Sequence, residues 1–200
     1  MVVDYLCDRV IEQDMAVACF YYDFASREAQ SPTNMLGSML KQLLSGLREI
    51  PVEIVKKFRS QKKAIGGRRL QLADIVKMCG AVTSLQRTFI CVDALDECVP
   101  RHQLEVLGAL GQILRGSPNT RIFMTGRSHV RRLVERELSG RITSVSIESR
   151  ENDIITYLRA RLGKDTTPGA MDSLLEKEIM RNIPEEISET CVPTWVLRKR

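Results

Sequence analysis

Three carboxylates stand close together after an apolar run in the middle of the chain. Asp93 ends the run Thr88-Phe-Ile-Cys-Val-Asp93, and Asp96 and Glu97 follow three and four residues later. Ligands of open parallel sheets bind at the carboxyl ends of strands. A carboxylate there can hold Mg²⁺, which prefers oxygen ligands, and a second one can orient a water for in-line attack on a γ-phosphate.

The same residues have a plainer interpretation, in which they form an acidic loop that caps the following helix. An apolar strand that ends in a single Asp is common, so Asp93 alone indicates little. The pair Asp96-Glu97 directly after it favours the metal and phosphate site over the capping loop.

Two further polar residues lie at the carboxyl end of the next predicted strand. Thr125 ends the run Arg121-Ile-Phe-Met-Thr125, and Arg127 follows one glycine later. If the two strands are neighbours, both residues lie beside the acidic site, where an arginine can bind phosphate oxygens with its fixed fork of donors. Taken alone, Arg127 would be interpreted as a surface ion pair at the start of a helix.

The elements that position these residues alternate between short strands and longer helices. β-Branched and aromatic content predicts strands over residues 15–24, 87–93, 120–126 and 141–147. Apolar residues at helical spacing predict helices that open at Ser31 and Pro51, and others over 72–82, 104–114, 130–138, 152–162 and 168–180. This order predicts the α/β class, with a parallel sheet and helices on both faces.

Composition restricts the class of protein further. The chain has 200 residues, 44% of them hydrophobic and 28% charged, so it can bury a core. Its net charge of +5 is small, and its basic and acidic residues are interleaved along the chain. Both features argue against a dedicated nucleic-acid binder. The six cysteines include no CxxC pair, the apolar runs are too short for a membrane span, and the first residues do not resemble a signal peptide. We therefore expect a globular cytoplasmic protein in a reducing compartment, with no membrane partner.

Several short segments, taken in order, resemble one protein family. They are Phe20-Tyr-Tyr-Asp-Phe24, Gln30-Ser-Pro-Thr-Asn-Met-Leu36 with Gln42-Leu-Leu44, Val92-Asp-Ala-Leu-Asp-Glu-Cys98, Met124-Thr-Gly-Arg-Ser-His129 and Asn152-Asp-Ile-Ile-Thr-Tyr-Leu158. Over residues 1–165 the chain resembles the NACHT-type P-loop NTPase domain of fungal NOD-like receptors, also described as the nephrocystin-3-like N-terminal domain.

The resemblance implies a fold, ligands and residue roles. The fold is a three-layer parallel sheet of the additional-strand P-loop NTPase type, and the ligands are Mg²⁺ with ATP or GTP. By position, Asp93 serves the Mg²⁺, Asp96 and Glu97 serve the hydrolytic water, and Arg127 matches the sensor arginine, with Thr125 beside it in the nucleotide site. Nucleotide binding in that family switches an oligomerising signalling module, usually joined to repeats, so we expect protein partners or self-association.

One defining element of that family is absent from the sequence. No segment matches GxxxxGK[ST], the glycine-rich loop whose backbone N–H groups hold the phosphates. Residues 3–10 resemble the second half of the helix that follows this loop. We therefore infer that the chain starts just downstream of the loop and expect it not to bind nucleotide tightly as it stands.

The missing segment includes a strand as well. The implied sheet order places this strand between the one that ends at Thr125 and the one over residues 142–147. Without it, those two strands either pair directly or leave a gap with unpaired backbone groups, so we expect a marginally stable chain or one that needs a partner strand. Residues 166–200 are expected to begin a helical linker and then form an irregular tail.

These observations leave three functions open. The first is an incomplete NACHT-type nucleotide-binding signalling module that has lost its activity with the loop. The second is a non-catalytic protein-interaction module on the same scaffold, which the missing loop favours. The third is a hydrolase that uses Asp93 and Glu97 as acid and base, for which the sequence offers no supporting histidine or substrate motif.

Overall fold

The computed structural model describes residues 2–13, 15–63, 70–138, 141–148, 151–163, 172–188 and 191–198, in some places the backbone alone. Packing divides the chain into two units. The first contains residues 1–145 and 194–200, and the second contains residues 146–193. The expected boundary between a domain over residues 1–165 and a segment over 166–200 remains a prediction.

Three parallel strands form the frame of the first unit. β1 (Met15–Tyr21) pairs with β2 (Arg87–Asp93), and β2 pairs with β3 (Thr120–Thr125). The full sheet has the order β1-β2-β3-β5-β4, with β4 spanning Arg141–Glu148 and β5 spanning Cys191–Arg198. The predicted α/β class with a parallel sheet is confirmed for β1, β2 and β3.

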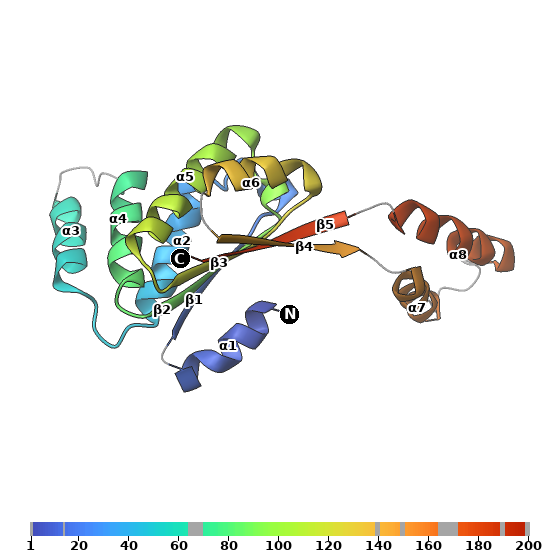
Figure 1. Cartoon of the computed structure of the whole chain (residues 1–200), viewed down its shortest axis with the longest axis horizontal. Helices are drawn as coiled ribbons and strands as arrows, with labels where there is room; N and C mark the ends of the chain where they lie inside the picture. The colour runs from blue at the N-terminus through green and yellow to red at the C-terminus, as the bar shows by residue number, and fades with distance from the viewer. Residues whose placement is uncertain are drawn as a thin grey trace. The chain divides into compact units, whose positions relative to one another are not determined.

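Helices cover both faces of this sheet (Figure 1). α1 (Val2–Gln13) lies on one side. The other side carries α2 (Pro32–Ser45), α4 (Leu72–Thr83), α5 (Pro100–Gly116) and α6 (Arg131–Glu137), with α3 (Val52–Lys63) beyond α4. Short 3-10 turns follow the carboxyl ends of three strands: η1 (Phe24–Ser26), η2 (Leu95–Glu97) and η3 (Ser128–Val130).

The second unit contains two helices that pack on each other. α7 (Glu151–Leu162) buries Ile154 and Leu158, and α8 covers Ser173–Ser188. The helix predicted over 168–180 thus begins later and runs further than expected; residues 164–171 and the predicted loop at 65–69 lie outside the described residues. None of the helices in the described part of the chain is long and apolar enough to cross a membrane.

The core lies between the sheet and the larger helical layer. α2 begins at the side-chain cap of Ser31 with Pro32 in its first turn, and it buries Leu36, Met39 and Leu43. β2 contributes Ile90 and Val92, which are at most 1% exposed. Burying side chains of this size stabilises the fold by about 1.5–3 kcal/mol each. Cys91, which lies between them and faces the other side of the sheet, is 3% exposed, so β2 is covered on both faces.

The cysteines described here are free thiols: Cys7, Cys19, Cys79, Cys91 and Cys98. Burial raises the pKa of Cys79 and of Cys91 to about 12. At neutral pH these two thiols are therefore protonated and pack as small hydrophobic groups.

β5 occupies the position where the sequence led us to expect a gap. It lies between β3 and β4 in the sheet order and pairs with β3 in the antiparallel direction, from Arg121 opposite Arg198 to Thr125 opposite Thr194. The expectation that β3 and β4 pair directly or leave a gap is therefore wrong. The backbone groups on the edge of β3 need partners, and the C-terminal segment, for which the sequence predicts no regular element, supplies them.

The outer edge of β1 is covered by a side chain. β1 is an edge strand, and the side-chain amide of Gln42 on α2 takes the place of a neighbouring strand beside Cys19. The Cys19 backbone N–H donates to Gln42 Oε1 at 2.9 Å, and Gln42 Nε2 donates to the Cys19 carbonyl at 2.8 Å. Both backbone groups are thereby satisfied, which blocks edge-to-edge pairing at this point.

Replacing this amide tests its contribution. We expect Gln42→Leu to lower the free energy of unfolding by about 1–3 kcal/mol, because it leaves both backbone groups of Cys19 without a partner. Urea unfolding followed by circular dichroism measures the change. Lys41→Leu, at the exposed neighbouring position, serves as the control and should shift stability by less than about 0.5 kcal/mol; equal effects of the two substitutions would contradict the role of Gln42.

Candidate functional site

The predicted site residues lie at the carboxyl ends of β2 and β3. Asp93 is the last residue of β2 and Thr125 the last residue of β3, and the register pairs Val92 with Met124 just before them. Because the two strands are parallel neighbours, both polar side chains emerge at the same edge of the sheet. The sequence expectation that they lie side by side is met by this register.

The hydroxyl of Thr125 joins the two strand ends. It donates a hydrogen bond to Asp93 Oδ1 and accepts one from the backbone N–H of Ala94 at 2.9 Å. The Tyr22 backbone N–H donates to the Asp93 carbonyl at 3.1 Å, which extends the pairing with β1 to the same level. Thr125 thus fixes the orientation of the Asp93 carboxylate.

Ala94 gives the turn after β2 its shape. Its φ is 53° and its ψ is 50°, a left-handed conformation that costs a residue with a Cβ about 1–2 kcal/mol. The bend starts η2, so that Asp96 and Glu97 return toward the end of β3. Both backbone groups of Ala94 are bonded in this conformation, since its N–H donates to Thr125 Oγ1 at 2.9 Å and its carbonyl accepts from the Glu97 N–H at 2.9 Å.

A buried amide anchors η2 from below. Gln103 on α5 is 7% exposed, and its Nε2 donates to the Cys98 carbonyl at 3.1 Å and, at 3.5 Å, to the Leu95 carbonyl. Leu95 is fully buried beneath the turn. The acidic turn is therefore held by its backbone, and its carboxylates are left to face the end of β3.

Arg127 binds both of these carboxylates. Its backbone N–H donates to Asp96 Oδ1 at 3.2 Å, its Nε lies 3.2 Å from Asp96 Oδ2, and its Nη2 lies 3.7 Å from Glu97 Oε1. The Asp96 side chain is 8% exposed, whereas that of Arg127 is 64% exposed. The arginine therefore lies over the acidic turn with much of its surface toward solvent.

The structure thus brings together all the residues singled out in the sequence. Asp93 and Thr125 form one hydrogen-bonded pair, and Asp96, Glu97 and Arg127 form an ion-paired group beside it. Within the described residues, no three carboxylate, histidine or cysteine side chains cluster closely enough to hold a metal by themselves. A divalent cation at this site would therefore need ligands beyond these side chains, such as phosphate oxygens and water.

Sequence reasoning missed the supporting residues. Ala94 adopts a left-handed conformation, but alanine, unlike glycine or asparagine, does not indicate such a conformation in a sequence. Gln103 is one of several polar residues at the start of a helix, so nothing in the sequence distinguishes it. Tyr22 was assigned only to a strand; in the structure its buried hydroxyl lies near the Cys98 thiol without a hydrogen bond of ordinary geometry. Burial raises the pKa of Tyr22 far above its usual value, so the Tyr22 hydroxyl stays protonated and uncharged at neutral pH.

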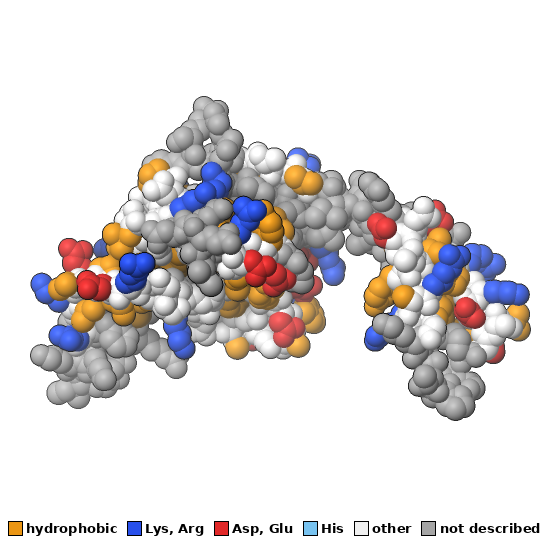
Figure 2. All heavy atoms as spheres, turned by 90° about the horizontal axis from the view of Figure 1, so that it is seen from below, with side chains coloured by type: hydrophobic (Ala, Val, Ile, Leu, Met, Phe, Trp, Pro, Cys, Tyr) orange, Lys and Arg blue, Asp and Glu red, His pale blue; other side chains and the backbone are white. Residues whose placement is uncertain are grey.

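Figure 2 shows Lys and Arg side chains in small groups between acidic and hydrophobic ones on the face that it presents.

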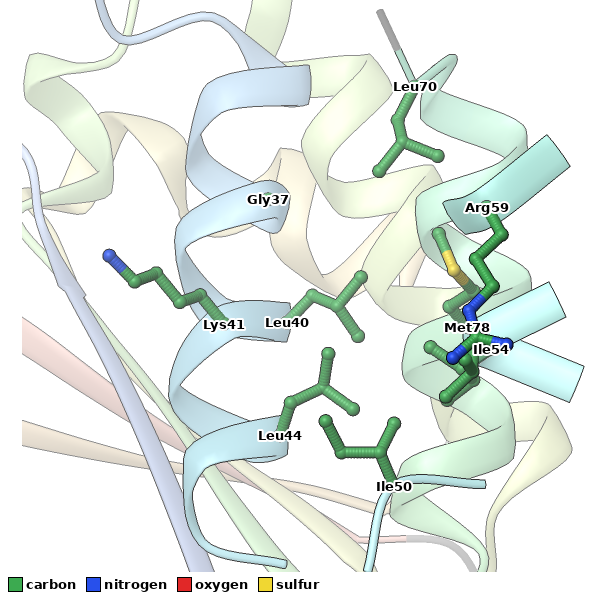
Figure 3. A pocket seen from close by; sticks show the side chains of 10 residues that line it. Gly37, Leu40, Lys41, Leu44, Ile50, Ile54, Arg59, Leu70 and Met78 are labelled. Carbon is green, nitrogen blue, oxygen red and sulfur yellow. The ribbon is translucent and has the colours of Figure 1, made fainter. Parts of the chain in front are cut away.

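A separate pocket of about 560 Å³ lies between α2, α3 and α4. Its lining is mainly aliphatic, with Leu40, Leu44 and Ile50 pointing into it and Lys41 pointing away (Figure 3). None of the predicted site residues lines it.

The role of the Thr125 hydroxyl can be tested by stability. We expect Thr125→Val to destabilise the fold by about 1–3 kcal/mol, because Ala94 N–H and Asp93 both lose their partner. Thr125→Ser, which keeps the hydroxyl, should recover most of that loss. Thermal unfolding of both variants measures this, and a valine variant as stable as the wild type would contradict the assigned hydrogen bonds.

Comparison with solved structures gives a fold relation. The structure of the Orc1 protein of Aeropyrum pernix, solved in complex with DNA, superposes with a TM-score of 0.51 at 16% sequence identity. The alignment covers 90% of this chain and 44% of that one, so the chain spans less than half the length of that structure. At this identity the likeness shows the fold alone, and it agrees with an α/β architecture of the P-loop NTPase kind.

Other comparisons add little. A structure described as an antibiotic related methyltransferase gives a TM-score of 0.32 at 10% identity, over 99% of this chain and 94% of that one. That score is too low to indicate a shared fold. A search of curated protein sequences gives no significant match.

The family assignment comes from sequence. Residues 1–127 match the profile of the family described as "Nephrocystin 3, N-terminal". The matched region ends at Arg127, so it contains every candidate site residue. Since the match spans more than half of the 200 residues, the chain belongs to the nephrocystin 3 N-terminal family.

Proposed function

We propose that this chain carries the metal-binding and hydrolytic side of a NACHT-type nucleotide site, with Mg²⁺ and ATP or GTP as ligands. The observation that carries the proposal is the pairing of Asp93 with Thr125 at the adjacent carboxyl ends of β2 and β3. Ligands of open α/β sheets bind at such ends. A fixed carboxylate at this edge is suited to holding a hydrated divalent cation beside a phosphate chain.

One oxygen of the Asp93 carboxylate has no hydrogen-bond partner among the described residues. Oδ1 accepts the bond from Thr125, whereas Oδ2 accepts no hydrogen bond from the described part of the chain. Asp93 would therefore hold Mg²⁺ through Oδ2, directly or through water. Thr125 would act by keeping the carboxylate in place, since its donor is already engaged with Asp93.

Arg127 would serve both the acidic turn and the nucleotide. Without a ligand it forms ion pairs with Asp96 and Glu97, and its single positive charge offsets one of their two negative charges. A phosphate chain at the sheet edge would compete for this exposed guanidinium, because phosphate oxygens match its fork of donors. Release of the carboxylates would then leave Asp96 and Glu97 able to orient a water.

Affinity is expected to be low. The chain has no GxxxxGK[ST] segment, so it lacks the converging N–H groups and the lysine that bind the β- and γ-phosphates in complete sites. The chain would then be the incomplete form of a nucleotide-dependent signalling module. Protein partners or self-association, and a cytoplasmic location, belong to this proposal on the strength of the resemblance to fungal NOD-like receptors.

A specific observation favours a second candidate, a non-catalytic interaction module on the same scaffold. The Asp96 and Glu97 carboxylates already form ion pairs with Arg127, an arrangement that needs no ligand. This alternative predicts that the acidic turn contributes to stability alone.

Titration with fluorescent ATP, with and without Mg²⁺, separates the two candidates. The nucleotide module predicts saturable, Mg²⁺-dependent binding with a dissociation constant on the order of 100 µM or weaker, a few kcal/mol short of tight nucleotide sites. Asp93→Asn should weaken binding at least about tenfold and remove its dependence on Mg²⁺.

Glu105→Gln provides the matched control, since it removes one exposed carboxylate on α5 outside the site. It should leave binding unchanged. Absence of saturation at several millimolar nucleotide in the wild-type chain would exclude the nucleotide module and leave the interaction module.

A further inference from the structure

We propose that the pocket between α2, α3 and α4 binds a small aliphatic carboxylate, such as a medium-chain fatty acid. The chain of the ligand would lie among the aliphatic side chains of the pocket, and its carboxylate would bind Arg59. This site is separate from the proposed nucleotide site, because none of the residues of that site lines the pocket. The inference rests on the volume of the pocket, its lining and the charge of Arg59.

The pocket has the size of a small-molecule site. Its volume of about 560 Å³ lies within the range of about 300–1,000 Å³ that is usual for such sites. Leu40 and Leu44 on α2 form one wall, and Ile50, in the segment before α3, points into the same space (Figure 3). Residues from α3 and α4 complete the lining. The volume therefore suits one small molecule held between three helices.

The lining selects an apolar ligand. Apart from Lys41 and Arg59, the described residues that line the pocket are one glycine and aliphatic or methionine side chains. No hydroxyl, amide or carboxylate side chain is among them, so a sugar or a nucleobase would lose its hydrogen bonds to water without replacement. An aliphatic chain has no such groups, and each buried CH₂ raises affinity about fourfold.

α3 is a lightly attached wall of this pocket. Ile54 is 5% exposed and is the one buried residue among the described side chains of this helix, whereas Val52 is 65% exposed. Ile50 is 47% exposed although it lines an apolar pocket, so it would gain burial when the pocket is filled. Elements with few buried contacts open locally while the rest of a domain stays folded. A ligand can therefore enter by displacement of α3, with no change in the sheet.

The charge at the pocket selects an anion. Arg59 is exposed, and it forms no hydrogen bond or ion pair with another described residue. Its side chain runs along the wall toward Ile54 and Met78, whereas Lys41 points away (Figure 3). No acidic side chain of the described residues lines the pocket. The Arg59 guanidinium can therefore bind a carboxylate with two parallel donors, and an uncharged ligand would leave them unused.

Calorimetric titration of the full chain with octanoate, decanoate and decan-1-ol tests the ligand class. We expect saturable binding of one decanoate per chain. Octanoate should bind about fifteenfold more weakly, because it buries two fewer CH₂ groups. Decan-1-ol has the same chain without the charge, so it should bind about tenfold more weakly than decanoate.

A charge variant tests the role of Arg59. Arg59→Gln should weaken decanoate binding about tenfold and leave decan-1-ol binding unchanged, because only the carboxylate loses its partner. Lys56→Gln removes one positive charge from the same helix at an exposed position outside the lining, and it serves as the matched control. It should bind both ligands as the wild type does.

A second variant fills the pocket. Ile50→Trp places a larger side chain at its mouth, and it should weaken binding of decanoate and decan-1-ol alike by at least about tenfold, because little space is left for the chain. Leu85→Trp puts the same indole at another exposed apolar position, outside the lining, and should change neither. Thermal unfolding of both variants shows whether they are folded.

Amide hydrogen exchange of the wild-type chain locates the ligand without any substitution. Decanoate should slow exchange in α3 and leave exchange in β2 unchanged, because a filled pocket holds α3 against α2 and α4. Slower exchange in β2 with no change in α3 would place the ligand elsewhere and overturn the proposal.

The other outcomes decide between the possible occupants. If neither decanoate nor decan-1-ol saturates the wild-type chain at about 1 mM, the pocket is not a ligand site. If decan-1-ol binds as tightly as decanoate, or if Arg59→Gln binds decanoate as the wild type does, the pocket takes uncharged apolar molecules and the carboxylate is wrong. Cosedimentation of the chain with phosphatidylcholine vesicles that contain no fatty acid would identify a membrane-binding face and overturn a free ligand.

This inference stands apart from the proposed function. Asp93→Asn should bind decanoate as the wild type does, because Asp93 does not line the pocket. Failure of nucleotide binding therefore leaves the carboxylate site intact. Loss of decanoate binding in Asp93→Asn with a folded core would contradict the separation of the two sites.

Discussion

Pairing of the backbone of β3 on both of its edges is the constraint on which the rest of the structure depends. One edge is satisfied by β2, which is buried on both faces and contributes Ile90 and Val92 to the core. The other edge would expose a row of N–H and C=O groups inside the sheet, which is costly away from water. β5 supplies the missing partner from the C-terminal end of the chain.

The register that follows from this pairing also creates the site. Because β2 and β3 end at the same edge, Thr125 can bond to Asp93 and Ala94, and Arg127 can bind the carboxylates of η2. The bond to Ala94 holds a left-handed residue that starts the acidic turn. Strand pairing, a local bend and an ion pair thus form one connected arrangement, and a change in any of them reaches the others.

The family assignment and the fold rest on two separate comparisons. The match to the nephrocystin 3 N-terminal family covers the site residues, and the Orc1 structure supports a P-loop NTPase-like architecture. The acidic turn is complete, whereas the sequence holds no glycine-rich loop to bind phosphates. The proposed weak, metal-dependent nucleotide binding is consistent with both observations.

The sequence by itself predicted most of the strands and helices, and it predicted the candidate residues that the fold brings together at the carboxyl ends of β2 and β3. β2 was predicted over residues 87–93 as found, because an unbroken apolar run is a local signal; the predicted strand over 15–24 ends earlier, at Tyr21, since Asp23 caps η1. Only the tertiary structure decided the hydrogen bond between Asp93 and Thr125, the cover of Cys19 by Gln42, and the insertion of β5. Each of these joins residues far apart in the chain, and whether they form depends on which backbone groups the rest of the sheet leaves unpaired.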